Sequence, residues 1–223
     1  MKATLFFSAV TKFLLGLVLT AALLFVPAGT VDYPNGQLFL LLLFLPMFAA
    51  GVVLMVVNPD LLRRRLQAKE QQGEQRLVVV LSGLMFLCGF VAAGLDFRFG
   101  WSRMPSWVSI CAAVVLLLAY GLYGEVLREN TWLSRTVQVQ EGQQVVDRGL
   151  YDIVRHPMYA ATILLFLSMP LVLGSWVSLV LFLPYPFLIA KRIGNEEQVL
   201  EAELKGYAEY KSRVKYRLIP YIW

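Results

Sequence analysis

The 223-residue chain has few of the residues that build soluble enzymes and disulfide-bonded domains. Charged residues make up only 16% of it, histidine occurs once, and the two cysteines, Cys88 and Cys111, both lie inside apolar runs. These cysteines indicate neither a disulfide framework nor a cysteine metal site. The hydrophobic fraction of 58% and the mean hydropathy of +0.64 lie well above those of soluble domains. We therefore predict an integral membrane protein.

The motifs of the common soluble cofactor and catalytic sites are also missing. The chain has no G-x-G-x-x-G, no phosphate loop, no H-E-x-x-H and no G-x-S-x-G. One histidine and scattered carboxylates argue against a transition metal held by the protein. The net charge is +5, and the basic residues lie next to apolar segments. We therefore expect contact with anionic lipid and no nucleic-acid partner.

Four apolar segments are long enough to cross a bilayer as helices, since a hydrocarbon core of about 30 Å needs about 20 residues. They are residues 5–26, 37–57, 77–97 and 107–127. The first is longer than the apolar part of a signal peptide, and similar segments follow it, so we predict a true span.

A further apolar region, residues 159–190, is interrupted by Pro170, Gly174, Pro184 and Pro186. We predict a helical hairpin that turns near Gly174, with short arms whose broken backbone faces protein or a wet cavity. The predicted fold is an all-α, polytopic transmembrane protein with four full spans, this Pro-broken hairpin, five or six crossings, and a C-terminal helix and tail.

The distribution of lysine and arginine predicts the orientation. Eighteen of these 20 residues lie near the N-terminus, in the loops 58–76 and 128–158, or from residue 191 onward; the loops 27–36 and 98–106 hold only Arg98 and Arg103. By the positive-inside rule, both termini and both large loops are cytoplasmic. The basic loop 58–76 has the pattern of a surface helix that anchors beside the membrane with a solvated charged face.

We divide the chain into an N-terminal region of three spans, residues 1–106, and a C-terminal region, residues 107–223. Charged and aromatic residues become dense from Gly124 onward, so any chemistry is expected there, on the cytoplasmic side. In "GEVLREN", Glu125 and Arg128 share a helical face at the membrane edge and are spaced to form an ion pair. That pair has either a local structural role or a functional one.

The segment "VVDRGLYDIVRHPMY" contains the only histidine. Asp147, Gly149 and Tyr151 indicate a turn, and the residue before a proline is biased away from helix, so His156 should start a helix whose first turn holds Pro157. Free N–H groups there suit an anionic ligand, whereas the plain alternative is a capping histidine.

Two more polar segments follow the hairpin. In "AKRIGNEEQVLEAELKGYAEY", Arg192 and Glu196 share a face, and Leu200, Leu204 and Tyr207 extend an apolar stripe. This is either part of a site or an amphipathic interfacial helix. The end, "YKSRVKYRLIPYIW", is either an aromatic membrane anchor or a tail that folds back over a pocket.

Taken in this order, the four segments resemble the isoprenylcysteine carboxyl methyltransferase family and its phospholipid N-methyltransferase relatives, over residues 124–223. The R-H-P-x-Y element followed by Glu-Glu after a Pro-broken hairpin is fairly specific to this group. The resemblance implies a membrane-embedded enzyme that takes S-adenosylmethionine from the cytoplasm and methylates a lipophilic or amphipathic acceptor, most often a carboxylate.

The resemblance also implies roles for individual residues. Arg128 and Arg192 would stand near the reacting centre, and Glu197 is the candidate base if the acceptor is a thiol or an amine. The cofactor pocket would be formed by His156, Pro157, Met158, Tyr159, Glu196, Glu197, Tyr207 and Tyr210.

The stretch 131–144 does not match its counterpart in the prenylcysteine enzymes, so that substrate is not implied. Two alternatives remain open. The C-terminal pattern also resembles the ends of membrane sterol reductases, which bind NADPH, and a small transport or scaffold protein would bind no nucleotide-like ligand.

Overall fold

The computed structural model describes residues 2–66, 73–134 and 136–223, and within these the regular structure is entirely helical. Lys69 and Arg135, which we used to predict the orientation, lie outside the described residues, as does the side chain of Lys2. The helices are α1 (Lys2–Ala28), α2 (Pro34–Val57), α3 (Pro59–Leu66), α4 (Gly73–Phe99), α5 (Ser106–Glu129), α6 (Leu150–Ile153), α7 (Pro157–Val172), α8 (Trp176–Phe182), α9 (Tyr185–Glu203) and α10 (Tyr207–Arg213).

The predicted spans are present as long apolar helices. Five segments are long and apolar enough to cross a membrane: residues 4–28, 34–57, 75–99, 106–129 and 176–203. The first four contain the four predicted spans. Large apolar side chains are exposed along α1 and α2, which is expected of helices that face lipid.

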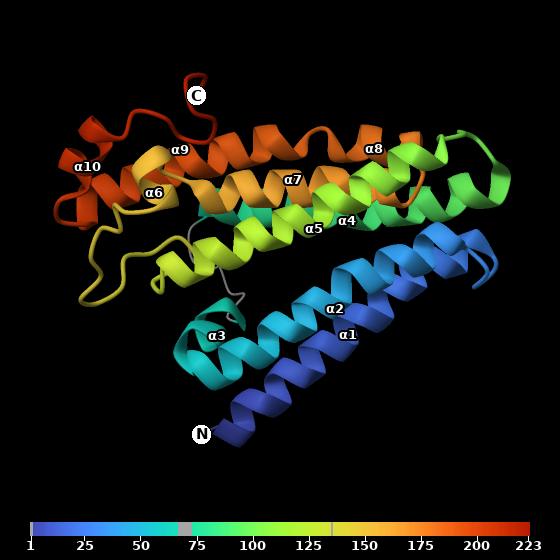
Figure 1. Ribbon diagram of the computed structural model, residues 1–223, viewed down its shortest axis with the longest axis horizontal. Coiled ribbons are helices and arrows are strands. Elements are labelled where there is room, and N and C mark those ends of the chain that lie inside the picture. The colour runs from blue at the N-terminus through green and yellow to red at the C-terminus, as the bar shows by residue number, and fades with distance from the viewer. Residues whose placement is uncertain (1, 67–72, 135) are drawn as a thin grey trace.

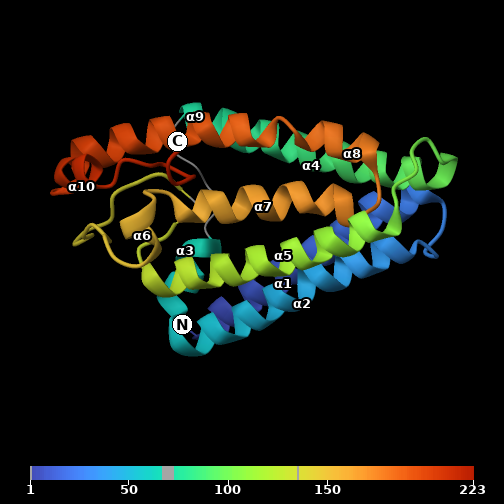
Figure 2. The ribbon, with the colours of Figure 1, turned by 45° about the horizontal axis from the view of Figure 1, so that its top comes forward.

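The predicted Pro-broken hairpin is also confirmed. The chain turns between α7 and α8 at Gly174, whose φ of +77° is favourable only for glycine. Pro184 separates α8 from α9, so the second arm is interrupted. In both views α7 runs between α5 and the α8–α9 arm (Figures 1 and 2), and it buries Tyr159, Leu165 and Met169.

The two ends of the bundle differ in what they contain. The termini lie at one end together with α3, α6 and α10, while the links α1–α2, α4–α5 and α7–α8 lie at the other (Figure 1). The segments rich in lysine and arginine therefore gather at one end, as they would if that end faced one side of a membrane.

Candidate functional site

His156 occupies the predicted position at the start of a helix. It is the residue before α7, with φ −128° and ψ 59°, and Pro157 fills the first helical position. The backbone here pairs with the C-terminal tail: Arg155 N donates to Tyr216 O at 2.9 Å, and His156 N donates to Arg217 O at 2.9 Å. The tail thus fixes the backbone that presents the histidine.

A buried ionic cluster holds this backbone against α9. Glu197, only 2% exposed, accepts a hydrogen bond from Arg155 Nε at 2.7 Å, and His156 Nε2 lies 3.2 Å from the same oxygen. The other oxygen lies 3.0 Å from the guanidinium of Arg217 and 3.8 Å from Lys211 Nζ. Several cationic partners stabilise a carboxylate that burial would otherwise destabilise. Glu197 therefore joins the start of α7, α9 and the tail.

A second polar contact joins α7 to α9 one turn away. The phenol of Tyr159 donates to the carboxylate of Glu196 and accepts a hydrogen bond from Arg192 Nε at 2.8 Å. Arg192 and Glu196 share a face, as predicted, and the buried Tyr159 hydroxyl lies between them. This arrangement holds a guanidinium and a carboxylate close together.

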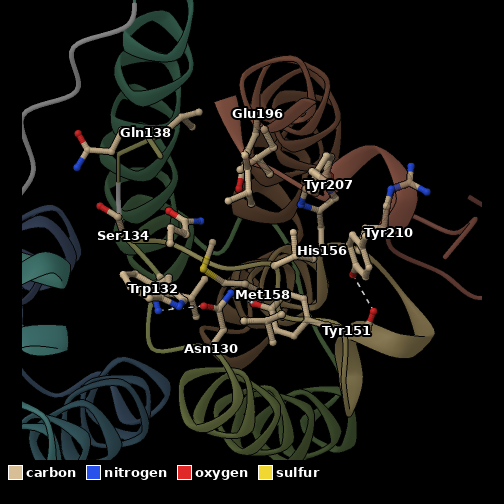
Figure 3. A pocket seen from close by; sticks show the side chains of 18 of the residues that line it. Asn130, Trp132, Ser134, Gln138, Tyr151, His156, Met158, Glu196, Tyr207 and Tyr210 are labelled. Atoms are coloured by element: carbon tan, nitrogen blue, oxygen red, sulfur yellow. Dashed lines mark hydrogen bonds between the residues drawn. The ribbon is translucent and has the colours of Figure 1, made fainter. Parts of the chain in front are cut away.

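These groups meet at a cavity of about 100 Å³ that is partly open to solvent. Concave sites lined by apolar and aromatic side chains with a few polar groups are where proteins usually bind small molecules. Figure 3 shows side chains from the start of α7, from α9 and from α10 turned toward one space. The predicted residues that line it are His156, Met158, Tyr159, Arg192, Glu196, Tyr207 and Tyr210.

Three predicted residues have other positions. Glu197 is enclosed by the ionic cluster behind His156, and neither it nor Pro157 is among the described residues that line the cavity. Arg128 is also absent from that lining; its side chain is 73% exposed, and its Nε donates to Glu125 at 2.8 Å. The structure confirms the predicted local ion pair but does not bring Arg128 to the other site residues.

No pattern in the sequence indicated one whole wall of the cavity. The irregular segment 130–146, which includes the stretch 131–144 that did not match the prenylcysteine enzymes, supplies half of the lining. Its own side chains stabilise it: Asn130 accepts from Trp132 N at 3.0 Å, and Gln143 accepts from Gln140 N at 2.9 Å. The residues are Asn130, Trp132, Leu133, Ser134, Thr136, Val137, Gln138, Gln143, Gln144, Val145 and Val146.

The helix α10 closes another side. Tyr210 donates its hydroxyl to the carbonyl of Tyr151 at 2.7 Å (Figure 3), and α10 packs on Val139 and Val145 of the irregular wall. The buried Tyr207 hydroxyl has no hydrogen-bond partner among the described residues. Burial, reinforced by nearby carboxylates, raises the pKa of Tyr207, so this hydroxyl stays protonated and able to donate.

The predicted family resemblance is confirmed by comparison with known proteins. Residues 110–202 match the sequence model of the Isoprenylcysteine carboxyl methyltransferase (ICMT) family. The match runs from α5 to α9 and so includes His156, Tyr159, Arg192 and the Glu196–Glu197 pair, whereas α10 lies outside it.

Curated relatives match shorter parts of the chain. The Delta(14)-sterol reductase TM7SF2 of Mus musculus is 31% identical over 91 residues, 40% of this chain and 22% of that protein. The uncharacterized protein YpbQ of Bacillus subtilis is 30% identical over 103 residues, 45% of this chain and 61% of that protein. The cobalt-zinc-cadmium resistance protein CzcN of Cupriavidus metallidurans is 30% identical over 128 residues, 56% of each. The chain therefore spans between a fifth and three fifths of the relatives it matches.

The fold is similar to that of a solved membrane methyltransferase. The structure of the eukaryotic intramembrane Ras methyltransferase ICMT superposes with a TM-score of 0.59 at 19% sequence identity, over 99% of this chain and 85% of that one. The polytopic helical fold extends beyond the matched family region to the N-terminal helices.

Proposed function

We propose that the chain is an integral membrane methyltransferase that takes its methyl group from S-adenosylmethionine and transfers it to an amphipathic acceptor. The observation that carries this proposal is the cavity in which His156, Tyr159, Glu196 and Tyr207 meet. The family match over residues 110–202 supports the same chemistry.

The residues at the cavity fit this cofactor. S-adenosylmethionine carries a carboxylate, a ribose, an adenine and a cationic sulfonium, so it needs donors, carboxylates and aromatic faces. Tyr207 offers a buried hydroxyl without a partner among the described residues, and Glu196 offers a carboxylate. Trp132 and Tyr210 add aromatic surface to the lining. An orphaned buried hydroxyl is costly unless a ligand satisfies it.

Bound there, the cofactor would supply an electrophilic methyl group, and the protein would need only to position the acceptor and exclude water. Arg192 lines the cavity and is held by Tyr159, so we propose that it binds an acceptor carboxylate by charge-assisted hydrogen bonds. The exposed Arg128 is less well placed for this role.

Glu197 is better placed to orient His156 than to accept a proton from an acceptor, because the cationic side chains of Arg155 and Arg217 surround it. If the acceptor is a thiol or an amine, Glu196 is the carboxylate that reaches the cavity. The carboxylate of Glu196, rather than that of Glu197 in the buried cluster, would then accept the proton of the acceptor.

We propose that the cavity opens toward the cytoplasm. Its lining includes Tyr207 and Tyr210 of α10. This helix lies at the end of the bundle that holds both termini and α3, where lysine and arginine are concentrated (Figure 1). The positive-inside rule assigns such an end to the cytoplasm. An acceptor anchored in the bilayer would reach it between the helices.

The sterol reductase relative supports a second candidate, binding of NADPH. Equilibrium titration of purified, detergent-solubilised protein with S-adenosylhomocysteine and with NADPH separates the two. We expect saturable binding of S-adenosylhomocysteine that NADPH does not displace. The variant Glu196→Gln should weaken it, and Glu203→Gln, an exposed change near the end of the same helix, should not. Binding of NADPH alone would indicate a reductase, and binding of neither would indicate a protein without this kind of enzyme site.

A further inference from the structure

The short helix α3 is capped at its start and held by α1 at its end. Asn58 caps it by accepting a hydrogen bond from Leu61 N at 3.0 Å, and Lys12 Nζ donates to Leu66 O at 2.7 Å. Leu61 and Leu62 are buried. We predicted a surface anchor with a solvated charged face. This prediction was wrong for part of the helix, because two of its three arginines, Arg64 and Arg65, form hydrogen bonds with another segment of the protein.

Arg65 reaches the wall of the cavity. Its guanidinium donates to the carbonyl of Ser134 at 3.1 Å and to the hydroxyl of Tyr123, and it lies 5.5 Å from the centre of the Tyr123 ring. One of its nitrogens is also 3.7 Å from the sulfur of Met158. Ser134 and Met158 both line the cavity, Ser134 from the irregular segment and Met158 from the first turn of α7.

The neighbouring arginine contacts the same wall. Arg64 donates to the carbonyl of Thr131 at 2.7 Å. The two arginines therefore hold two carbonyls of the irregular segment from one docked helix. Between residues 130 and 134 that segment has only a turn and irregular backbone, so side-chain contacts contribute to fixing its conformation.

We propose that Arg65, assisted by Arg64, is a positioning residue for the cofactor cavity. It fixes the wall at residues 131–134 and the side chain of Met158. It thereby sets the fraction of protein molecules whose cavity is in the conformation that binds the ligand. The helix lies outside both the family match and the C-terminal region to which we assigned the chemistry. The N-terminal region would then complete the site as well as anchor it.

The physical effect follows from the cost of ordering an irregular segment. Hydrogen bonds from a guanidinium to carbonyls are charge-assisted and hold two points of the backbone in place. Without them the segment would sample other conformations, and the apparent affinity would fall with the fraction that remains competent. Arg65 does not line the cavity, so it acts through Ser134 and Met158.

The inference rests on the proposed function for the identity of the ligand, S-adenosylhomocysteine. The test compares Arg65→Gln with Arg63→Gln, because Arg63 pairs with Asp60 at 3.2 Å on the exposed side of the same helix. Both proteins are measured for S-adenosylhomocysteine affinity, thermal stability and hydrogen exchange of residues 130–136. We expect Arg65→Gln to bind about tenfold more weakly than wild type, since a hydrogen bond to a charged group is lost. Exchange at 130–136 should be faster, and the melting temperature should stay close to that of Arg63→Gln.

Two further variants keep the test decisive. Arg65→Lys retains a cation that reaches one carbonyl and should recover part of the affinity. Tyr123→Phe removes only the hydroxyl that accepts a hydrogen bond from Arg65. It should weaken S-adenosylhomocysteine binding by less than Arg65→Gln does, and it provides a test if Arg65→Gln fails to fold. If Arg65→Gln and Arg63→Gln have equal affinity for S-adenosylhomocysteine and equal hydrogen exchange at residues 130–136, the inference is wrong. Binding of S-adenosylhomocysteine by wild type would still support the proposed function in that case. If wild type binds no S-adenosylhomocysteine, the proposed function fails, and the exchange comparison alone decides whether Arg65 orders the wall.

Discussion

Replacement of Glu197 by glutamine tests whether the buried ionic cluster holds the site together. The substitution keeps the shape of the side chain and removes its charge. Arg155 and His156, which like Glu197 have side chains about 5% exposed or less, would lose their anionic partner in the interior. The contact would change from a charge-assisted pair to a neutral hydrogen bond.

The expected loss of stability follows from the burial of these groups. Removing one partner of a buried ion pair costs roughly 3 to 5 kcal/mol, because the other charge stays buried without compensation. We expect the lower end, about 3 kcal/mol, since glutamine still accepts one hydrogen bond and Arg155 keeps its bonds to the carbonyls of Val214 and Lys215. The contacts to Arg217 and Lys211 add less, because their side chains are about one third exposed.

The matched control is Glu201→Gln on the same helix. Glu201 pairs with Lys211 at 2.6 Å but is 40% exposed, so its loss should cost less than about 1 kcal/mol. Reversible unfolding in detergent gives the stability of both variants, and hydrogen exchange reports on the tail from Val214 onward. Glu197→Gln should release the tail, which pairs with the backbone of Arg155 and His156. Equal stability of both variants, with exchange of the tail as in wild type, would show that the ionic cluster does not hold the tail in place.

Three further predictions concern other contacts of the site. Gly149→Ala should destabilise the protein by about 1 to 3 kcal/mol in thermal unfolding, because φ is +61° and the added Cβ would lie 1.8 Å from a carboxylate oxygen of Glu129; unchanged stability would contradict this. Tyr159→Phe removes the hydroxyl that joins an arginine and a carboxylate at the cavity, and should weaken S-adenosylhomocysteine binding about tenfold in a titration; wild-type affinity would argue against that link. Arg213 donates to Asp147 and lowers the pKa of that carboxyl. The ion pair should therefore stabilise the protein at neutral pH, and this stabilisation should be lost as the pH falls below about 4. Melting temperatures of wild type and Asp147→Asn that differ only in acid would contradict this.

The spans and the hairpin were predictable because the bilayer imposes a length and an apolar composition on each helix. The start of α7 was also predictable, since a proline restricts the residue before it and fits the first helical turn. These are local rules that act over a few residues. They correctly gave the position of His156, the pair of Glu125 with Arg128 and the shared face of Arg192 and Glu196.

The rest of the site depends on contacts between distant segments. Arg155 meets Glu197 across 42 residues and Arg65 meets Ser134 across 69, and no spacing in the sequence indicates either contact. The irregular wall has no periodicity by which its inward residues could be recognised. Whether Arg128 lines the cavity depends on where the end of α5 lies relative to that wall rather than on its own motif.

The proposed methyl transfer requires that the cavity between α7, α9 and α10 binds S-adenosylmethionine. Calorimetric titration of the purified wild-type protein with S-adenosylhomocysteine tests it most directly, with Tyr207→Phe as the variant, since this change removes only the buried hydroxyl that has no partner among the described residues. We expect saturable binding of one ligand per chain and an affinity about tenfold weaker in Tyr207→Phe, whose melting temperature without ligand should be no lower than that of wild type. Absence of binding by wild type, or equal affinity in both proteins, would contradict it.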